Sequence, residues 1–306
     1  MLKMSSRRTF LKTLGATAPM TPMAGLMNAT EAHSRGGENE VAGLSTQRLP
    51  QWQKSYVIHH LRDWNDMPAQ ERWFWRYHAP EVMRAPEVTR YVNFRAVPAP
   101  AGAEAYGYYN YHVHEATVLS VPSSGGTSGA GSLSKTPEPA PMDVAVCVVP
   151  AAPTEDFLGS DLTMDEKTIF RWLIVFKYPD GVSAEEGERW FLDVHAKEVM
   201  RQPGLTRFFS YKAVAAGLPE SAPGQKSFMR QATRLRQGWH RLSEQWYENA
   251  NGWRKSVIES PPQYTKPPWA KYEKYPFLEP FTDFVSTFIL ERPSEDYTRD
   301  LRPIYI

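Results

Sequence analysis

Four of the chain's eight histidines fall in strand-like stretches of its first half: His59, His60, His112 and His114. Histidine is the residue best suited to move protons near neutral pH. Because side chains alternate across a strand, His112 and His114 share a face, and only one of His59 and His60 can point into the same interior. We interpret His60, His112 and His114 as acid–base candidates and Glu115 as the carboxylate that orients them. A solvated or structural set of histidines is the alternative.

The spacing His112-x-His114, with Glu115 next to it, also suits a divalent metal, so a metal site stays open beside the acid–base interpretation. The second half of the chain has Phe176, Lys177, Arg241 and Ser243 at the positions that match the four strand histidines. We therefore expect the chemistry to lie in the first half.

A second candidate pair, His78 and Glu81, lies on a predicted helix. At 100° per residue, both fall within an apolar arc formed by Trp73, Phe74, Trp75, Tyr77 and Val82. A carboxylate three residues after a histidine can orient the imidazole and raise its pKa. We predict that His78 and Glu81 support the strand histidines. The alternative is a structural histidine that bonds a backbone carbonyl and fixes the helix to the sheet.

Aromatic side chains are concentrated in the segment 261–281. It is either an irregular connection packed on the core or a lid over an apolar, aromatic ligand. With the lid interpretation, the residues expected to contact the ligand are Trp75, Tyr109, His195, Trp269 and Tyr272.

The chain carries an internal duplication at an offset of 117 residues. Glu71-Arg72-Trp73-Phe74 recurs as Glu188-Arg189-Trp190-Phe191, and the helical pair recurs as His195 and Glu198. Between residues 71 and 98, 15 of 28 positions are identical without a gap. Such self-similarity indicates two homologous modules.

Each module reads as strand, helix, strand, strand, helix, strand. In the first, strands are predicted at 56–62, 89–97, 108–120 and 144–149, with a Gly/Ser/Pro loop at 123–141 in place of the second helix. In the second they are predicted at 173–178, 206–214, 240–248 and 283–290, with a short helix at 251–259. Asp66 and Ser183 are predicted N-caps. This order predicts an α+β fold of two tandem ferredoxin-like modules, 49–153 and 154–306, paired as in a dimeric α/β-barrel.

The pattern Trp-x-x-x-x-His-Ala after a strand and turn, followed by Pro and an aromatic strand, resembles the EthD-like branch of the dimeric α/β-barrel superfamily. The resemblance covers about residues 54–292. It implies relatives that include cofactor-free isomerases, polyketide cyclases and dehydratases, and small monooxygenases. Haem proteins also occur in this superfamily, which leaves haem as a second cofactor alternative. The Gly-x-x-Asp-Gly motif of exported dye-decolorising peroxidases is absent.

The N-terminus carries Ser6-Arg7-Arg8-Thr9-Phe10-Leu11-Lys12, which matches the twin-arginine export consensus. We expect residues 1–48 to be a signal and linker, cleavage near Ala32, and a periplasmic protein whose partner during export is the twin-arginine machinery. A net charge of +1 argues against nucleic acid as a partner, and the single Cys147 excludes an internal disulfide.

These observations predict an exported enzyme of the lyase or isomerase type that performs cofactor-free acid–base chemistry on a small aromatic or polyketide-like compound. Two other functions remain open. One is a haem or oxygen-using oxidoreductase, and the other is a non-catalytic carrier of apolar ligands, which strand histidines facing solvent would favour. A homodimer is compatible with each of these three functions.

Overall fold

The computed structural model describes residues 51–85, 88–120, 142–148, 152–159, 169–214 and 238–300. All of them belong to one compact unit of residues 47–306. The predicted signal and the predicted loop at 123–141 lie outside the described residues.

The first half forms an antiparallel sheet in the order β2-β3-β1-β4. Its strands are β1 (Gln51–His60), β2 (Val88–Arg95), β3 (His112–Ser120) and β4 (Met142–Val148). Between β1 and β2 run η3 (Trp64–Asp66), α1 (Met67–Trp73), the π-helical turn η4 (Phe74–His78) and α2 (Ala79–Val82), and between β2 and β3 lies η5 (Ala103–Tyr106).

The second half repeats this plan in the order β7-β8-β6-β9. Its elements are β6 (Phe170–Phe176), α3 (Ala184–Trp190), η6 (Phe191–His195), α4 (Ala196–Val199), β7 (Leu205–Val214), β8 (Arg241–Tyr247), α6 (Ala250–Arg254), η7 (Lys255–Glu259) and β9 (Phe284–Leu290). Both sheets have the strand order of a ferredoxin-like unit, so the predicted fold class is confirmed.

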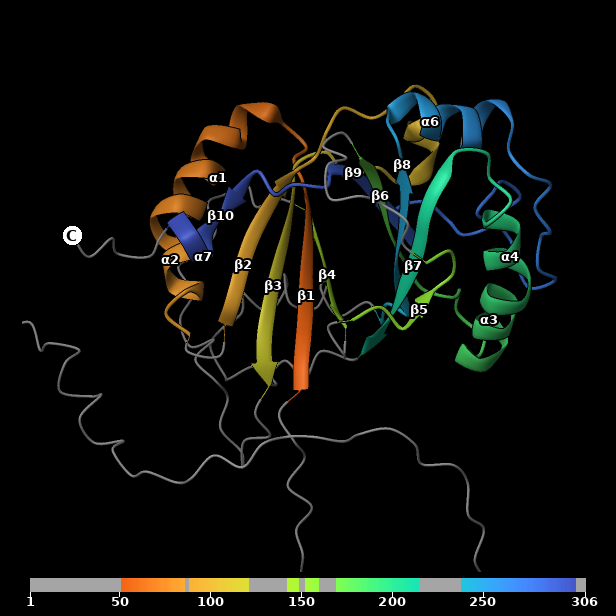
Figure 1. Ribbon diagram of the computed structural model, residues 1–306, viewed down its shortest axis with the longest axis horizontal. Helices are drawn as coiled ribbons and strands as arrows, with labels where there is room; N and C mark the ends of the chain where they lie inside the picture. The colour runs from red at the N-terminus through yellow and green to blue at the C-terminus, as the bar shows by residue number, and fades with distance from the viewer. Residues whose placement is uncertain are drawn as a thin grey trace, which may run out of the picture. The chain divides into compact units, whose positions relative to one another are not determined.

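The two sheets meet at both edges and enclose a shared core. On one side β4 pairs with β7. On the other, Val97 N donates to Phe288 O at 2.8 Å and Tyr109 N donates to Ser286 O at 2.7 Å. The helices α1–α2 and α3–α4 lie on opposite outer sides of the strands (Figure 1). The arrangement is barrel-like, with apolar side chains of both sheets between them, including Tyr56, Ile58, Val92, Phe94, Val113, Leu173, Val175, Phe209, Leu242, Val285 and Ile289.

Two short segments cross between the halves. The strand β5 (Glu155–Asp156) follows the first half in sequence but pairs with β7. The strand β10 (Glu295–Asp296) follows the second half but pairs with β2, and α7 (Tyr297–Asp300) comes directly after it. The short strand added to the sheet of each half therefore comes from the segment that follows the other half in the sequence.

Local details of the helices agree with the sequence in part. Ser183 caps α3 by accepting a hydrogen bond from Glu186 N at 3.1 Å, as predicted. Asp66 precedes α1 without a side-chain cap, and Asp63 instead accepts from Asn65 N at 2.9 Å. The predicted continuous helix is interrupted by η4, where a π turn advances each residue by less than 100°. Tyr77, expected in the apolar arc, is 53% exposed for this reason.

Candidate functional site

Four histidines converge between the first sheet and its helix. His112 and His114 of β3 face the helix together with His59 of β1, and His78 approaches from η4. The ring centroids of His114 lie 4.9 Å from His59, 5.7 Å from His112 and 6.1 Å from His78. The ring of Phe74 lies among them, 4.3 Å from that of His114. The placement of His112 and His114 on one face agrees with the alternation expected from the sequence.

This histidine cluster is buried, because the strand residues point away from the shared core and are covered by the helix. His112 is 1% exposed and His114 is 2% exposed. The alternative of a solvated set of strand histidines is therefore excluded for this pair. Strand histidines facing solvent would have favoured a non-catalytic carrier of apolar ligands, and His112 and His114 give that interpretation no support.

Glu71 of α1 is the carboxylate that contacts the cluster. Its Oε1 lies 3.1 Å from His112 Nε2 and accepts a hydrogen bond from the Tyr111 hydroxyl at 3.2 Å. Its Oε2 accepts from Arg95 Nη2 at 3.1 Å. Burial raises the pKa of Glu71, but the contacts with His112, Arg95 and Tyr111 outweigh it and leave that pKa below the ordinary value. Glu71 is therefore ionised at neutral pH.

The prediction that Glu115 orients the histidines is wrong. Glu115 follows His114 directly, so its side chain lies on the opposite face of β3. There it accepts from Arg90 Nη1 at 2.8 Å and lies 3.5 Å from Lys54 Nζ. The role predicted for Glu115 is available to Glu71 instead.

The second contact of the cluster joins His114 Nδ1 and the Tyr91 hydroxyl at 2.6 Å. Burial raises the pKa of Tyr91 well above its ordinary value, so the phenol keeps its proton. Among the described residues, His114 Nε2, His112 Nδ1 and His78 Nδ1 are buried without a hydrogen-bond partner, and His112 Nε2 approaches Glu71 without hydrogen-bond geometry. The first three are the free ring nitrogens with which a bound molecule could exchange protons.

Burial also decides the charge of the imidazoles. It lowers the pKa of His112 and lowers that of His114 further, with repulsion from neighbouring histidines acting in the same direction. It lowers the pKa of His78 to about 4, against the opposing effect of Glu81. His78, His112 and His114 are therefore neutral imidazoles, which can act as bases, next to an ionised carboxylate and a protonated phenol.

The remaining candidates of the first half lie around or apart from this cluster. His60 points to the other face of β1 and packs on Tyr109, with ring centroids 5.3 Å apart, so it does not join the other histidines. Trp75 packs edge-on against Tyr297 at 5.0 Å. Among the described parts of the chain, no group of three His, Cys, Asp or Glu side chains is arranged to hold a metal ion.

The equivalent place in the second half is filled by a closed ion network. Arg241, which matches His112, donates through Nη2 to Glu188 at 2.6 Å and also binds Glu155. Tyr178 donates to the same Glu188 at 2.7 Å, and Ser243 stands where the first half has His114. Arg241 is fully buried, and its two carboxylates outweigh the effect of burial and raise its pKa. A permanently charged guanidinium held this way cannot exchange protons.

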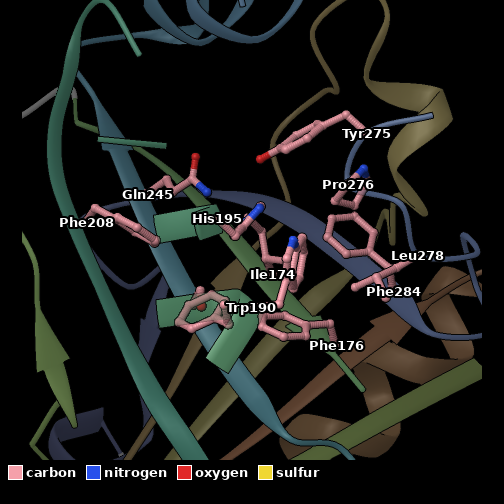
Figure 2. Close-up of a pocket in the computed structure, with 12 residues that line it drawn as sticks. Ile174, Phe176, Trp190, His195, Phe208, Gln245, Tyr275, Pro276, Leu278 and Phe284 are labelled. Carbon is pink, nitrogen blue, oxygen red and sulfur yellow. The ribbon is translucent and has the colours of Figure 1, made fainter. Parts of the chain in front are cut away.

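His195 lies on a small cavity that Trp190, Gln245 and Tyr275 also line (Figure 2). Its volume of about 10 Å³ has room for roughly one water molecule. The ring of Tyr275 stacks on His195 with centroids 5.7 Å apart, and burial lowers the pKa of His195 to about 3. The cavity beside His195 is therefore too small for the aromatic ligand that was expected to contact it.

The segment 261–281 packs on the second half. Glu198 accepts from Thr265 N at 2.9 Å and from Thr265 Oγ1 at 2.6 Å, so it fixes this segment rather than orienting His195. Trp269 packs on Trp190 with ring centroids 5.3 Å apart. Tyr272 lines an open cleft of about 390 Å³ beside Lys177 and Asp283. The structure thus brings the predicted ligand contacts of this segment to the second half, away from the histidine cluster.

Sequence reasoning missed Glu71, Tyr91, Arg95 and Glu295. Two signals could have found the carboxylates. Glu71 begins the duplicated block and lies seven residues, or two helical turns, before His78. A second short repeat, Pro153-Thr154-Glu155-Asp156-Phe157 and Pro293-Ser294-Glu295-Asp296-Tyr297, marks the two crossing segments.

None of the helices that the structure describes is long and apolar enough to cross a bilayer. No curated protein matches the chain. Among solved structures, a provisionally named monooxygenase from Lactobacillus acidophilus NCFM is similar at 10% identity, over 68% of this chain and 82% of that one. Its TM-score of 0.29 carries no argument about function. Residues 50–141, which contain the histidine cluster, match the family described as the chalcone isomerase N-terminal domain.

Proposed function

We propose that the chain is an isomerase that acts on a small aromatic compound by acid–base chemistry in its first half. The observation that carries this proposal is the contact between the half-buried Glu71 and the buried His112, beside the pair His114 and Tyr91. The family match of residues 50–141 supports both the type of reaction and the aromatic nature of the substrate. The EthD-like resemblance of the sequence points to the same kind of chemistry.

An isomerisation removes a proton from one atom and returns a proton to another, so it needs a base and an acid in one pocket. His112 is the base in this proposal, because Glu71 Oε1 lies 3.1 Å from its Nε2 and favours the proton on that nitrogen, which leaves Nδ1 as the proton acceptor. Glu71 also stabilises the imidazolium that forms. Tyr91 and His114 supply the acid, since the protonated phenol can pass a proton through the imidazole to the substrate. After each turnover the proton on His112 passes through water to the phenolate left at Tyr91, so no net proton is consumed.

The test uses a panel of hydroxylated chalcones, whose isomerisation is followed by the loss of their visible absorbance. His112→Gln should lower kcat by roughly 10²- to 10⁴-fold, the usual contribution of a positioned proton acceptor. Ser243→Ala is the matched control, because Ser243 is the second-half counterpart of His114 and plays no part in the proposed chemistry. Arg241 is unsuitable as a control, since its removal would leave two carboxylates without their buried partner.

An unchanged kcat in His112→Gln, with the folded state verified by its melting temperature, would exclude His112 as the base. Failure of the wild-type protein to turn over any of the chalcones would contradict the aromatic isomerase itself. The proposed chemistry requires no cofactor, and an absorption spectrum of the purified protein tests this, because bound haem gives an intense Soret band.

We also propose that the protein acts after export to the periplasm through the twin-arginine route. The support is the sequence around Arg7 and Arg8, which lies outside the described residues.

A further inference from the structure

Two short segments cross from one half of the molecule to the other, and we call them the crossing straps. The first is Thr154–Phe157 and the second is Ser294–Tyr297. Each contains Glu-Asp followed by an aromatic residue, and each adds two residues to the edge of the opposite sheet. The aromatic residue then packs into the opposite half: Phe157 stacks on Phe208 at 4.5 Å, and Tyr297 packs on Tyr91 at 5.1 Å.

The two straps are held by equivalent hydrogen bonds. Thr154 Oγ1 accepts from Lys212 N at 2.8 Å, and Ser294 Oγ accepts from Arg95 N at 2.9 Å. Arg95 and Lys212 are 117 residues apart, so they are matching positions of the duplication. Both straps therefore deliver their glutamate to the same place in the opposite half.

The residue that contacts the glutamate of the strap differs between the two halves. In the second half, Glu155 binds Arg241 of β8 directly, and Arg241 also holds Glu188. In the first half the matching residue of β3 is His112, and the arginine lies on β2 instead.

There Arg95 Nε donates to Glu295 Oε1 at 3.0 Å, and Arg95 Nη2 donates to Glu71 Oε2 at 3.1 Å. One arginine therefore links the strap to the carboxylate that contacts His112.

We infer that Glu295 is a positioning residue of the first-half site, acting through Arg95 on Glu71 and so on His112. This inference rests on the proposed function for its purpose, but the chain of contacts is independent of it. Glu295 compensates the charge of Arg95 and keeps its guanidinium directed at Glu71. The C-terminal strap thereby completes an acid–base site that the first half cannot complete alone.

The charged groups around His112 determine the direction in which its pKa should shift when Glu295 is changed. Glu71 of α1 raises the pKa of His112, whereas Arg95 of β2 and His59 of β1 lower it, and His114 lies beside it on β3. Glu295 opposes the charge of Arg95. Removing the charge of Glu295 leaves that of Arg95 uncompensated and should therefore lower the pKa of His112.

A purely structural strap would behave differently. If Glu295 only held the strap down, its loss would let water reach His112, and the pKa of His112 would rise towards its ordinary value. Glu295→Gln thus separates the two roles by the direction of the shift. Because Glu295 acts through Arg95, the shift caused by Glu295→Gln should disappear in an Arg95→Met background, which is the internal check.

The experiment is an NMR titration of the imidazole Cε1–H resonances of the full chain, with the His112 signal assigned by its loss in His112→Gln. The expected result is a downward shift of the His112 titration in Glu295→Gln and no further shift when Glu295→Gln is added to Arg95→Met. Glu155→Gln, the same substitution in the other strap, should leave that titration at its wild-type position. Where a chalcone is turned over, the acid limb of kcat/KM should move in the same direction as the titration.

An unshifted or raised His112 titration in Glu295→Gln would overturn the inference. The titration needs no substrate, so it can succeed while the chalcone panel fails. That outcome would retain the positioning of His112 and reject the proposed isomerase.

Discussion

His78 and His195 are matching residues of the duplication, and both keep a neutral ring because they are removed from water. Burial lowers the pKa of His78 to about 4 and that of His195 to about 3. In the unfolded chain both have the ordinary value of about 6.5. Below that pH the unfolded state therefore binds more protons than the folded state, and the free energy of unfolding falls as the pH falls.

We predict that the free energy of unfolding is at its full value above about pH 6.5 and decreases steadily below it. At pH 5 the loss should be on the order of 2 kcal/mol for each of these two histidines. His112 and His114 add to it in the same direction. Urea unfolding at pH 7.5 and pH 5 measures the difference, and His195→Gln should reduce it. Equal stability at the two pH values would contradict the neutral, buried state of these rings.

The residues of the site could be predicted from the sequence only in part, because the sequence pattern fixes strand faces but not the rotation of the helix over the sheet. Alternation along β3 was enough to place His112 and His114 on one face. The contact between Glu71 and His112 depends on how the helix is rotated over the sheet, and the π turn changes that rotation. Alternation also predicts that Glu115 points away from the histidines, so its expected role conflicted with the rule that placed them.

At the scale of the elements, α3 lies unusually close to the chain after β6. A Cβ added to Gly187 of α3 would come within 2.2 Å of the Tyr178 ring, whereas one added to Gly252 of α6 would meet Tyr247 Cβ at 3.6 Å, an ordinary contact. The glycine in α3 is therefore required by packing, and the glycine in α6 is not.

These two helical glycines should respond to the same substitution with opposite signs. Gly187→Ala forces α3 or Tyr178 to move and should destabilise the protein by about 1–3 kcal/mol, as overpacking usually does. Gly252→Ala removes a helix-unfavourable residue without a clash and should stabilise it by up to about 1 kcal/mol. Thermal or urea unfolding of both variants measures this. Destabilisation of similar size in both would show that the close approach to Tyr178 has no special cost.

The succession of elements was the most predictable part of the fold. The duplication placed matching strands 117 residues apart, and β1 and β6 do occupy equivalent places in their sheets. The observed strand ends differ from the predicted ones where a tertiary contact competes. The strand expected to begin at Tyr108 begins at His112, because Tyr108 forms a bridge with Ser286 of β9 instead. The crossing straps are too short to give a periodic signal.

At the scale of the whole molecule, the two halves are interlocked. Their sheets share one buried core, and each half takes an edge strand from the chain that follows the other. The first-half site receives Glu295 and Tyr297 from the last part of the described chain. The site is therefore complete only after almost the entire chain has been synthesised and folded. An export route that carries folded proteins suits such a molecule.

We therefore predict that export depends on the twin arginines. Replacing both Arg7 and Arg8 with lysine conserves the charge but removes the guanidinium pair of the consensus, and it should leave the precursor in the cytoplasm. Lys3→Gln, which changes the charge but keeps both arginines, should leave export intact. Cell fractionation measures the location, and N-terminal sequencing of the exported protein should find a start near residue 33. Periplasmic protein at the wild-type level in the double-lysine variant would rule out this route, whatever the enzyme does.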